Sequence, residues 1–264
     1  MSRYVSVAVL LVSALWAATP TTALAQGVDW TIAPYFWASD VGVDTTINGD
    51  PALGVDVPFS DLIDKLDGAL MFRVEARGPV FGAYFDFITI SLADSGSTPI
   101  GPGGPILGDL LTDTKLDLDI IELAGTYRWG EAVPGSVAVD AIVGIRYVDV
   151  SQSLDITLPG PGAGEIERGI SASEYDFMLG ARALGFFSEN WTWRLRADYS
   201  GGGTDGIVNL LGTIGWRFGS TNQFALEGGY RHMTVEFSDN LGAGVSSTSD
   251  ITMSGPLLGF LWTF

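Results

Sequence analysis

The residues of this sequence that could carry chemistry begin with His232, the only histidine in the chain. Thr234 follows two residues later, so in an extended strand both side chains lie on one face. A hydroxyl hydrogen-bonded to an imidazole is a workable nucleophile, and Glu236 or Asp250 is the candidate acid that would orient the ring. We therefore take His232 and Thr234 as candidate catalytic residues for a hydrolase. The competing interpretation places His232 at a membrane rim, where its amphipathic ring is favoured.

Carboxylates form the second group, because Ca²⁺ and Mg²⁺ prefer oxygen ligands. They gather in two acidic stretches, at Asp40, Asp44, Asp50, Asp56, Asp61, Asp64 and Asp67, and at Asp109, Asp113, Asp117 and Asp119. The Asp-x-Asp-x-Asp-Gly spacing of a calcium loop is absent from both stretches. One histidine and no cysteine exclude a histidine or thiolate metal cluster. We expect solvated acidic loops, with divalent cations as candidate partners, no defined metal site and no cofactor.

A third group of charges lies within segments of alternating polarity, where arginine and carboxylate occur together and lysine is nearly absent. Lysine is the usual solvating residue of an exposed sheet, whereas a planar guanidinium makes paired hydrogen bonds to a carboxylate. This composition predicts a ladder of paired charges inside a lumen. The predicted ladder comprises Arg73, Glu75, Asp86, Glu122, Arg128, Asp140, Arg146, Asp176, Arg182, Arg194, Arg196, Asp198, Arg217, Glu227 and Arg231, with Arg77 on the same face.

β-Strands must position these residues, because the chain is a series of alternating segments separated by Gly, Pro, Asn, Asp and Ser. Each segment has one apolar face and one polar or charged face. Strands are predicted at 29–41, 69–78, 81–93, 115–129, 136–150, 172–187, 191–200, 206–218, 223–237 and 249–264. The pattern predicts an all-β fold, a transmembrane antiparallel up-and-down β-barrel of about ten strands, with eight or twelve as alternatives.

The alternation changes phase within the segment 115–129. Leu118 and Ile120 share one face, whereas Ile121 and Leu123 occupy the other. The phase change indicates either a β-bulge or a strand that leaves the bilayer, with the neighbouring aspartates facing external water.

The connections between strands fall into two classes. Short ones are expected at 77–80, 130–135, 188–190 and 219–222, and long, polar ones at 42–68, 94–114, 151–171 and 238–248. Short turns at one end and long loops at the other are typical of outer-membrane barrels, and a tight turn at 201–205 is the exception. A short helix capped by Ser60 is expected at 59–66.

Both ends of the chain carry location signals. Arg3, the apolar run 4–18 and Ala23-Leu24-Ala25 predict a signal peptide at 1–25 and a barrel domain at 26–264. No later segment offers about 18 to 20 uninterrupted apolar residues, so in lipid only a barrel could satisfy the backbone. A formal net charge of −18 argues against nucleic-acid binding.

The sequence resembles the small bacterial outer-membrane β-barrel proteins, the OmpA/OmpX/OmpW-like group and the uncharacterised barrel families near it. The resemblance lies in the opening segment 30–37, in Glu227-Gly228-Gly229-Tyr230-Arg231, and in a last strand with Phe260, Trp262 and Phe264 on one face. It implies the outer membrane of a Gram-negative-type bacterium as the location and an assembly signal read by the barrel assembly machinery. The implied partners are outer-membrane lipid and lipopolysaccharide.

Two enzymatic barrel families bear on His232. The segment 231–234 resembles the His-x-Ser pattern of the lipid A deacylases, with Thr234 in place of the serine and without the Asn-Ala that follows it in that family. Omptin-type proteases couple a histidine to an aspartate, and His232 has no aspartate two residues before it.

We rank three functional hypotheses. The first is a non-enzymatic structural or surface-interaction protein with a charged, largely packed lumen. The second is a narrow, porin-like channel for small solutes or ions, which an arginine-lined interior would bias towards anions. The third is a lipid A-modifying hydrolase that uses His232.

Overall fold

The computed structural model describes residues 27–99, 109–158, 164–242 and 245–264. The predicted signal peptide 1–25 lies outside these residues. Within them, the chain is almost entirely β-strand.

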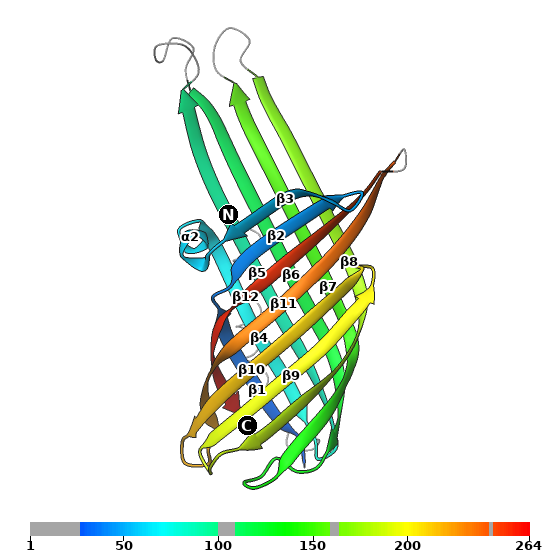
Figure 1. Ribbon diagram of the computed structural model, residues 1–264. Helices are drawn as coiled ribbons and strands as arrows, with labels where there is room; N and C mark the ends of the chain where they lie inside the picture. The colour runs from blue at the N-terminus through cyan, green and yellow to red at the C-terminus, as the bar shows by residue number, and fades with distance from the viewer. Residues whose placement is uncertain (1–26, 100–108, 159–163, 243–244) are drawn as a thin grey trace.

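Ten antiparallel strands close into a tilted barrel (Figure 1). The strands that form the ring are β1 (Asp29–Trp37), β4 (Leu66–Arg77), β5 (Phe81–Pro99), β6 (Asp109–Trp129), β7 (Val137–Leu158), β8 (Gly164–Phe186), β9 (Trp191–Gly202), β10 (Gly206–Phe218), β11 (Phe224–Gly242) and β12 (Val245–Thr263). The ring closes where β1 pairs with β12, and Trp30 N–H donates to Phe264 O at 2.9 Å while Phe264 N–H donates to Trp30 O at 2.9 Å. The predicted up-and-down barrel of about ten strands is confirmed.

A β-hairpin occupies most of the predicted loop 42–68, so the loop prediction is wrong there. It consists of β2 (Asp40–Ile47) and β3 (Asp50–Val57), and β2 pairs with β12 above the point where β1 ends. The turn residues Asn48 and Gly49 have φ angles of 52° and 83°. Asn-Gly in this conformation is the preferred two-residue hairpin turn, and together with the flanking alternation it is the signal that could have identified the hairpin.

The predicted first strand 29–41 is therefore two strands, which break at Ala38 and Ser39. Both pieces pair with β12, one after the other. At the break the backbone of Ala38 approaches Gly255 so closely that a Cβ on Gly255 would lie 1.8 Å from Ala38 O. A side chain at Gly255 would consequently force the two strands apart.

The predicted helix is present but shorter, as α2 (Phe59–Ile63), and Ser60 does not cap it. Phe59 N–H instead donates to the Asp40 carboxylate at 2.6 Å, which holds α2 next to β2 at the side of the barrel (Figure 1). Just beyond the helix, Lys65 Nζ lies 2.8 Å from Asp94 Oδ2. The hydrogen bond and charge of Asp94 raise the pKa of the Lys65 ammonium.

The strands extend much further than predicted at one end of the barrel. Most of the expected loops 94–114, 151–171 and 238–248 belongs to paired strands, and β5 to β8 project beyond the rest of the ring (Figure 1). We call this the long-strand end, and the opposite end, with its connections at 78–80, 130–136, 187–190 and 219–223, the short-turn end. The expected short turns and the tight turn before β10 are confirmed.

Strand β6 shows why polar residues continue as strand beyond the apolar part of the barrel. Its register with β5 and β7 is continuous, so the phase change is not a bulge. Leu123 points outward and is 54% exposed, whereas Ile120 points inward and is buried. Asp117 also points outward and is exposed. The strand keeps its orientation while the surroundings on its two faces change.

Candidate functional site

Most of the predicted charge ladder lies inside the short-turn half of the barrel, where strand register brings opposite charges side by side. Arg73 on β4 faces Asp86 on β5, and their nearest side-chain atoms lie 2.8 Å apart. Tyr35 on β1 donates to the same carboxylate at 2.6 Å. Thus three strands are tied together through Asp86 alone.

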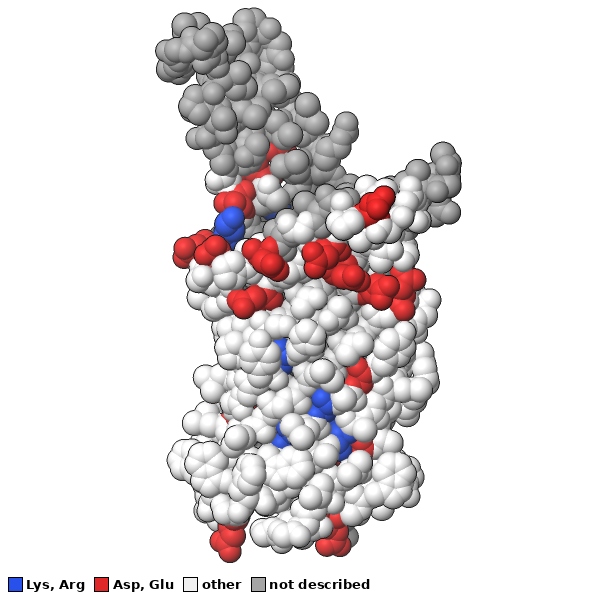
Figure 2. Space-filling view, viewed as in Figure 1, with Lys and Arg blue, Asp and Glu red and all other residues white. Residues whose placement is uncertain are grey.

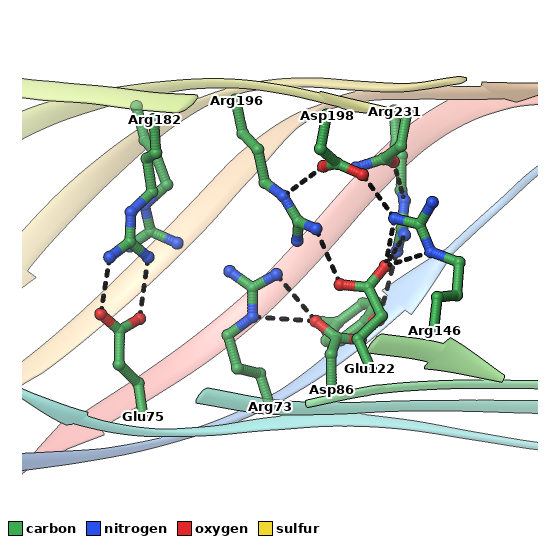
Figure 3. A network of polar contacts seen from close by, with 12 residues as sticks. Arg73, Glu75, Asp86, Glu122, Arg146, Arg182, Arg196, Asp198 and Arg231 are labelled. Carbon is green, nitrogen blue, oxygen red and sulfur yellow. Dashed lines mark hydrogen bonds and ion pairs between the residues drawn. The ribbon is translucent and has the colours of Figure 1, made fainter. Parts of the chain in front are cut away.

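Glu122 is the centre of the largest group of contacts (Figure 3). Its carboxylate lies 2.8 Å from Arg146, 2.7 Å from Arg196 and 3.5 Å from Arg231. Arg196 Nε also lies 2.6 Å from Asp198 Oδ2, at an angle too bent for a hydrogen bond. Arg196 Nη1 and Arg231 Nη2 likewise have no hydrogen-bond acceptor among the residues that the structure describes. The group therefore has more donors than carboxylate oxygens can satisfy.

A second group surrounds Asp140, nearer the short-turn end. Asp140 lies 2.7 Å from Arg128, 2.7 Å from Arg182 and 3.2 Å from Arg77. Glu75 accepts from Arg182 at 2.7 Å and 2.9 Å and also pairs with Arg77. Here too guanidinium groups outnumber carboxylates.

Asp176 lies inside the barrel, and none of its hydrogen-bond partners among the described residues is an arginine. It accepts from the backbone N–H groups of Gly203 and Thr204 at 3.0 and 2.9 Å, and from the hydroxyls of Thr204 and Ser200 at 2.6 and 3.2 Å. Asp176 consequently fastens the tight turn between β9 and β10 rather than joining the ion pairs.

Above these charges the lumen is apolar, which the sequence-based expectation of a polar interior did not include. Buried side chains from β1, β4, β5, β6, β7, β10, β11 and β12 meet across the barrel and form what we call the apolar plug. It consists of Trp37, Met71, Ile88, Ile120, Val148, Ile207, Met233, Val235 and Met253. The ion pairs and the plug thus occupy successive levels inside the barrel.

A cavity of about 260 Å³ remains below the ion pairs, at the short-turn end. We call it the mouth cavity. Its charged lining residues are Asp29, Glu75, Arg77, Arg128, Arg182, Arg194, Arg217 and Glu227. Arg194 and Arg217, two ladder arginines that belong to neither group of ion pairs, line this cavity.

The candidate catalytic residues His232 and Thr234 lie on the outer face of β11. His232 Nδ1 is 2.6 Å from Ser254 Oγ on β12, and its Nε2 is 3.3 Å from Thr234 Oγ1. Among the described contacts, neither Glu236 nor Asp250 touches the ring; these two acids face each other across the strands. The arrangement supplies hydroxyls on both ring nitrogens and no orienting carboxylate. It suits a polar residue at the upper edge of a lipid-facing surface better than a hydrolase centre.

The acidic stretches lie largely on strands and not in loops. Asp113, Asp117 and Asp119 belong to β6, and Asp40 and Asp44 to β2. Within the described ranges, no three histidine or carboxylate side chains come together as a metal site would require. Figure 2 shows the acidic residues of this face mostly above a broad zone of uncharged surface, in which only a few atoms of charged residues are visible.

The uncharged surface of that zone is an outward apolar belt. It includes Val143, Leu179, Leu195, Ile214 and Leu226, which are between 43% and 58% exposed. At the short-turn end it ends in aromatic contacts, with ring centroids 4.6 Å apart in the pair Tyr127–Trp129, 5.1 Å in Trp216–Phe218 and 4.9 Å in Trp262–Phe264. The proposed assembly residues Phe260, Trp262 and Phe264 all point outward there.

Among the residues described, no helical segment has the length and apolar character of a membrane-spanning helix. No protein-family model matches the sequence, and no curated protein matches it. The similarity to known proteins is one of structure.

The outer membrane protease OmpT from Escherichia coli superposes with a TM-score of 0.55 at 9% identity, covering 91% of this chain and 98% of that one. The translocator domain of the autotransporter NalP from Neisseria meningitidis gives a TM-score of 0.39 at 12% identity, with 98% and 97% covered. Ail from Yersinia pestis gives 0.30 at 8% identity, with 88% and 98% covered. Identities this low concern the fold alone. With its ring of ten antiparallel strands, the chain has the fold of the small bacterial outer-membrane β-barrels.

Proposed function

We propose that this chain is a non-conducting protein of the bacterial outer membrane, with a structural or surface-interaction role. Its barrel would anchor a β-sheet extension outside the membrane. The observation that carries the proposal is the apolar plug, because buried side chains such as Trp37, Ile120 and Met233 fill the barrel above the ion pairs. Hydrated ions and polar solutes do not cross an apolar, close-packed interior.

The membrane position follows from the outward belt. An exposed apolar surface that encircles a barrel favours lipid over water, and aromatic rings favour the membrane interface. The outward-facing acids of β2 and β6 would then stand in water. Lipid and lipopolysaccharide are the partners that such a belt would contact, and the barrel assembly machinery is the proposed reader of the aromatic residues on β12.

The orientation follows from the connections. In outer-membrane barrels the short turns face the periplasm and the long segments face outside. The short-turn end, with residue 264, is therefore assigned to the periplasm, and the β2–β3 hairpin to the cell surface.

An epitope inserted between Asn48 and Gly49 tests this orientation. Antibody should label intact cells that carry this insertion, whereas the same epitope at Ser220 should be labelled only after permeabilisation. The reverse pattern would show that the barrel is inverted or that the protein lies elsewhere.

Planar-bilayer recording tests the absence of conduction. The purified barrel should insert without stepwise current under either polarity. If discrete steps appear and replacing Arg194 or Arg217 by Ala alters their ion selectivity, the lumen is an open pore and the channel hypothesis replaces this proposal.

A further inference from the structure

The mouth cavity is lined by more cations than anions. Its walls carry the guanidinium groups of Arg77, Arg128, Arg182, Arg194 and Arg217 against the carboxylates of Asp29, Glu75 and Glu227. Asp140, behind the wall, offsets part of the difference through its contacts with Arg77, Arg128 and Arg182. The arginines on β9 and β10 are beyond its reach.

Arg217 on β10 is the least compensated of these arginines. Within the described residues it has no carboxylate at ion-pair distance. Its Nη2 donates to the backbone oxygen of Asn222 at a long 3.4 Å, and its guanidinium carbon lies 5.4 Å from the ring centre of Phe186. A backbone carbonyl and an aromatic face stabilise a cation without neutralising it.

Arg194 on β9 is only partly compensated. Its one ion pair within the described part of the chain joins Nη1 to Glu227 Oε2 at 3.5 Å, and the other oxygen of Glu227 accepts from Thr213 Oγ1 at 2.6 Å. The Arg194 side chain is 21% exposed, so part of its guanidinium is open to the cavity. Two guanidinium groups thus line the same cavity, and both have free donor capacity.

The walls of the barrel strengthen the effect of this charge. Apolar walls focus field lines in a cleft and raise the local concentration of counter-ions. Planar guanidinium groups match carboxylate and phosphate oxygens with two parallel hydrogen bonds. We propose that the mouth cavity binds an oxyanion, a phosphate or carboxylate group of a small molecule, through Arg217 and Arg194.

The ion pairs and the apolar plug close the cavity from above, so the ligand would enter and leave at the short-turn end. This makes the cavity a binding site and not a segment of a transport path. A neutral sugar would leave the Arg217 guanidinium unneutralised, and a cation would be repelled. Anion binding itself is independent of the proposed lack of conduction, since Arg217 and Arg194 line the cavity whether the lumen above it is open or closed.

Calorimetric titration of the protein purified in detergent tests the proposal. Inorganic phosphate and succinate are titrated separately, and the difference between unheated and boiled samples on a gel confirms folding of each preparation. At least one of the two anions should bind saturably, and which one binds assigns the ligand to phosphates or to carboxylates. Binding of neither anion at millimolar concentration overturns the proposal.

Two variants locate the site. Arg217→Gln should weaken binding about tenfold or more, because a charge-assisted hydrogen bond is lost. Lys65→Gln removes the same charge at the long-strand end and should leave binding unchanged. Equal affinities in wild type and Arg217→Gln, or an equal loss in Lys65→Gln, would contradict the assignment.

A second measurement uses the unaltered chain in case Arg217→Gln does not fold. Phenylglyoxal modifies accessible arginines, and mass spectrometry of the digested protein identifies the modified residues. The bound anion should protect Arg217 and Arg194 from modification. Identical modification of both residues with and without the anion would refute the site.

Discussion

At the residue scale, Glu122 is the most consequential side chain in the lumen. It is 1% exposed and contacts three guanidinium groups from three other strands. Buried charges are costly to leave unpaired, so such a group tolerates the loss of its central anion poorly. The ion pairs thereby make the folding of neighbouring strands interdependent.

Replacing Glu122 by Gln should destabilise the barrel by about 3–5 kcal/mol, because buried cations lose their shared counter-charge. Urea unfolding in lipid vesicles measures the difference. Asp113→Asn is the matched control on the same strand, since that side chain is exposed, and it should change stability by less than about 0.5 kcal/mol. Equal unfolding midpoints for wild type and Glu122→Gln would show that the ion pairs do not support the fold.

His232 is expected to behave as a residue of the lipid-facing rim. His232→Ala loses hydrogen bonds to Ser254 and Thr234 and should cost about 1–2 kcal/mol of stability. Mass spectrometry of lipids extracted from producing cells should show the same acyl composition with either protein. An acylation change that disappears in both His232→Ala and Ser254→Ala would instead establish a hydrolase.

The sequence led to the predicted charge ladder because arginine and carboxylate recur at every second position within several segments, which is the period of a strand. It could not identify their partners. Contacts such as Glu75 with Arg182, 2.7 Å apart but on strands that are not neighbours, depend on how the barrel curves. The role of Asp176 in a turn was likewise hidden, since an inward aspartate looks the same whether it meets an arginine or backbone N–H groups.

At the scale of the element, the strands keep one orientation while their environment changes. On β7, Ile145 and Tyr147 point outward in the belt, and Asp149 follows on the same face. On the opposite face Arg146 is buried among ion pairs and Val148 in the plug. Towards the short-turn end, β7 therefore has the pattern of a membrane-barrel strand, apolar outside and charged inside. Towards the long-strand end it has the pattern of a strand in a water-soluble sheet, polar outside and apolar inside.

The two faces of β6 should respond differently to the same truncation. Ile120→Ala removes buried volume from the plug and should cost about 2–5 kcal/mol. Ile121→Ala, on the outward face, should cost less, because lipid chains can occupy the space that the side chain leaves. Denaturant unfolding in vesicles compares the two variants. A larger loss of unfolding free energy for Ile121→Ala would contradict the assignment of Ile120, rather than Ile121, to the packed interior.

The β2–β3 hairpin should be separable from the ring. Gly49 has a φ of 83°, so Gly49→Val introduces strain of roughly 1–2 kcal/mol at the turn. Hydrogen exchange should accelerate over residues 40–57 and remain slow in β6 and β7. Faster exchange throughout the barrel would show that the hairpin is part of its cooperative unit.

The errors in the sequence-based elements have one physical origin. Polar stretches above the apolar belt were interpreted as loops because their outward residues are Ser, Thr and Asp. In the adjoining part of β6 the inward residues Leu118 and Ile120 hold the strand period, with Ile120 in the plug and Leu118 packed against it. The phase change at 115–129 signalled this, and the interpretation that the strand leaves the apolar zone agrees with the structure.

At the scale of the whole molecule, the barrel is divided into two environments stacked along its axis. The short-turn half has an apolar exterior and a charged interior, and the long-strand half has the opposite arrangement. Acidic side chains mark the boundary on the outside (Figure 2), and there Asp250 lies opposite both Asp44 and Glu236 on neighbouring strands. Like charges placed directly opposite each other destabilise a sheet. The interior of the long-strand half must therefore compensate for the destabilisation that these acids cause.

The closed ring of strands could be predicted from the sequence because each strand is recognisable from its own alternation of polar and apolar residues. The aromatic residues near the strand ends were recognisable in the same local way. The seam between β1, β2 and β12 was not, since pairing between strands far apart in the chain depends on where β1 stops. The plug was missed for a related reason, as its nine members are spread over eight strands, each of which contributes only one or two of them.

Single-cysteine labelling along β6 tests the central claim most directly, because the chain has no cysteine of its own. Spin labels at positions 117 to 127 in lipid vesicles report contact with oxygen dissolved in lipid and with a water-soluble nickel reagent. Oxygen should reach 121, 123, 125 and 127, and nickel should reach 117 and 119, while 118, 120, 122 and 124 stay protected from both. Lipid contact at 118 and 120, or nickel contact along all odd positions, would contradict the two-environment barrel.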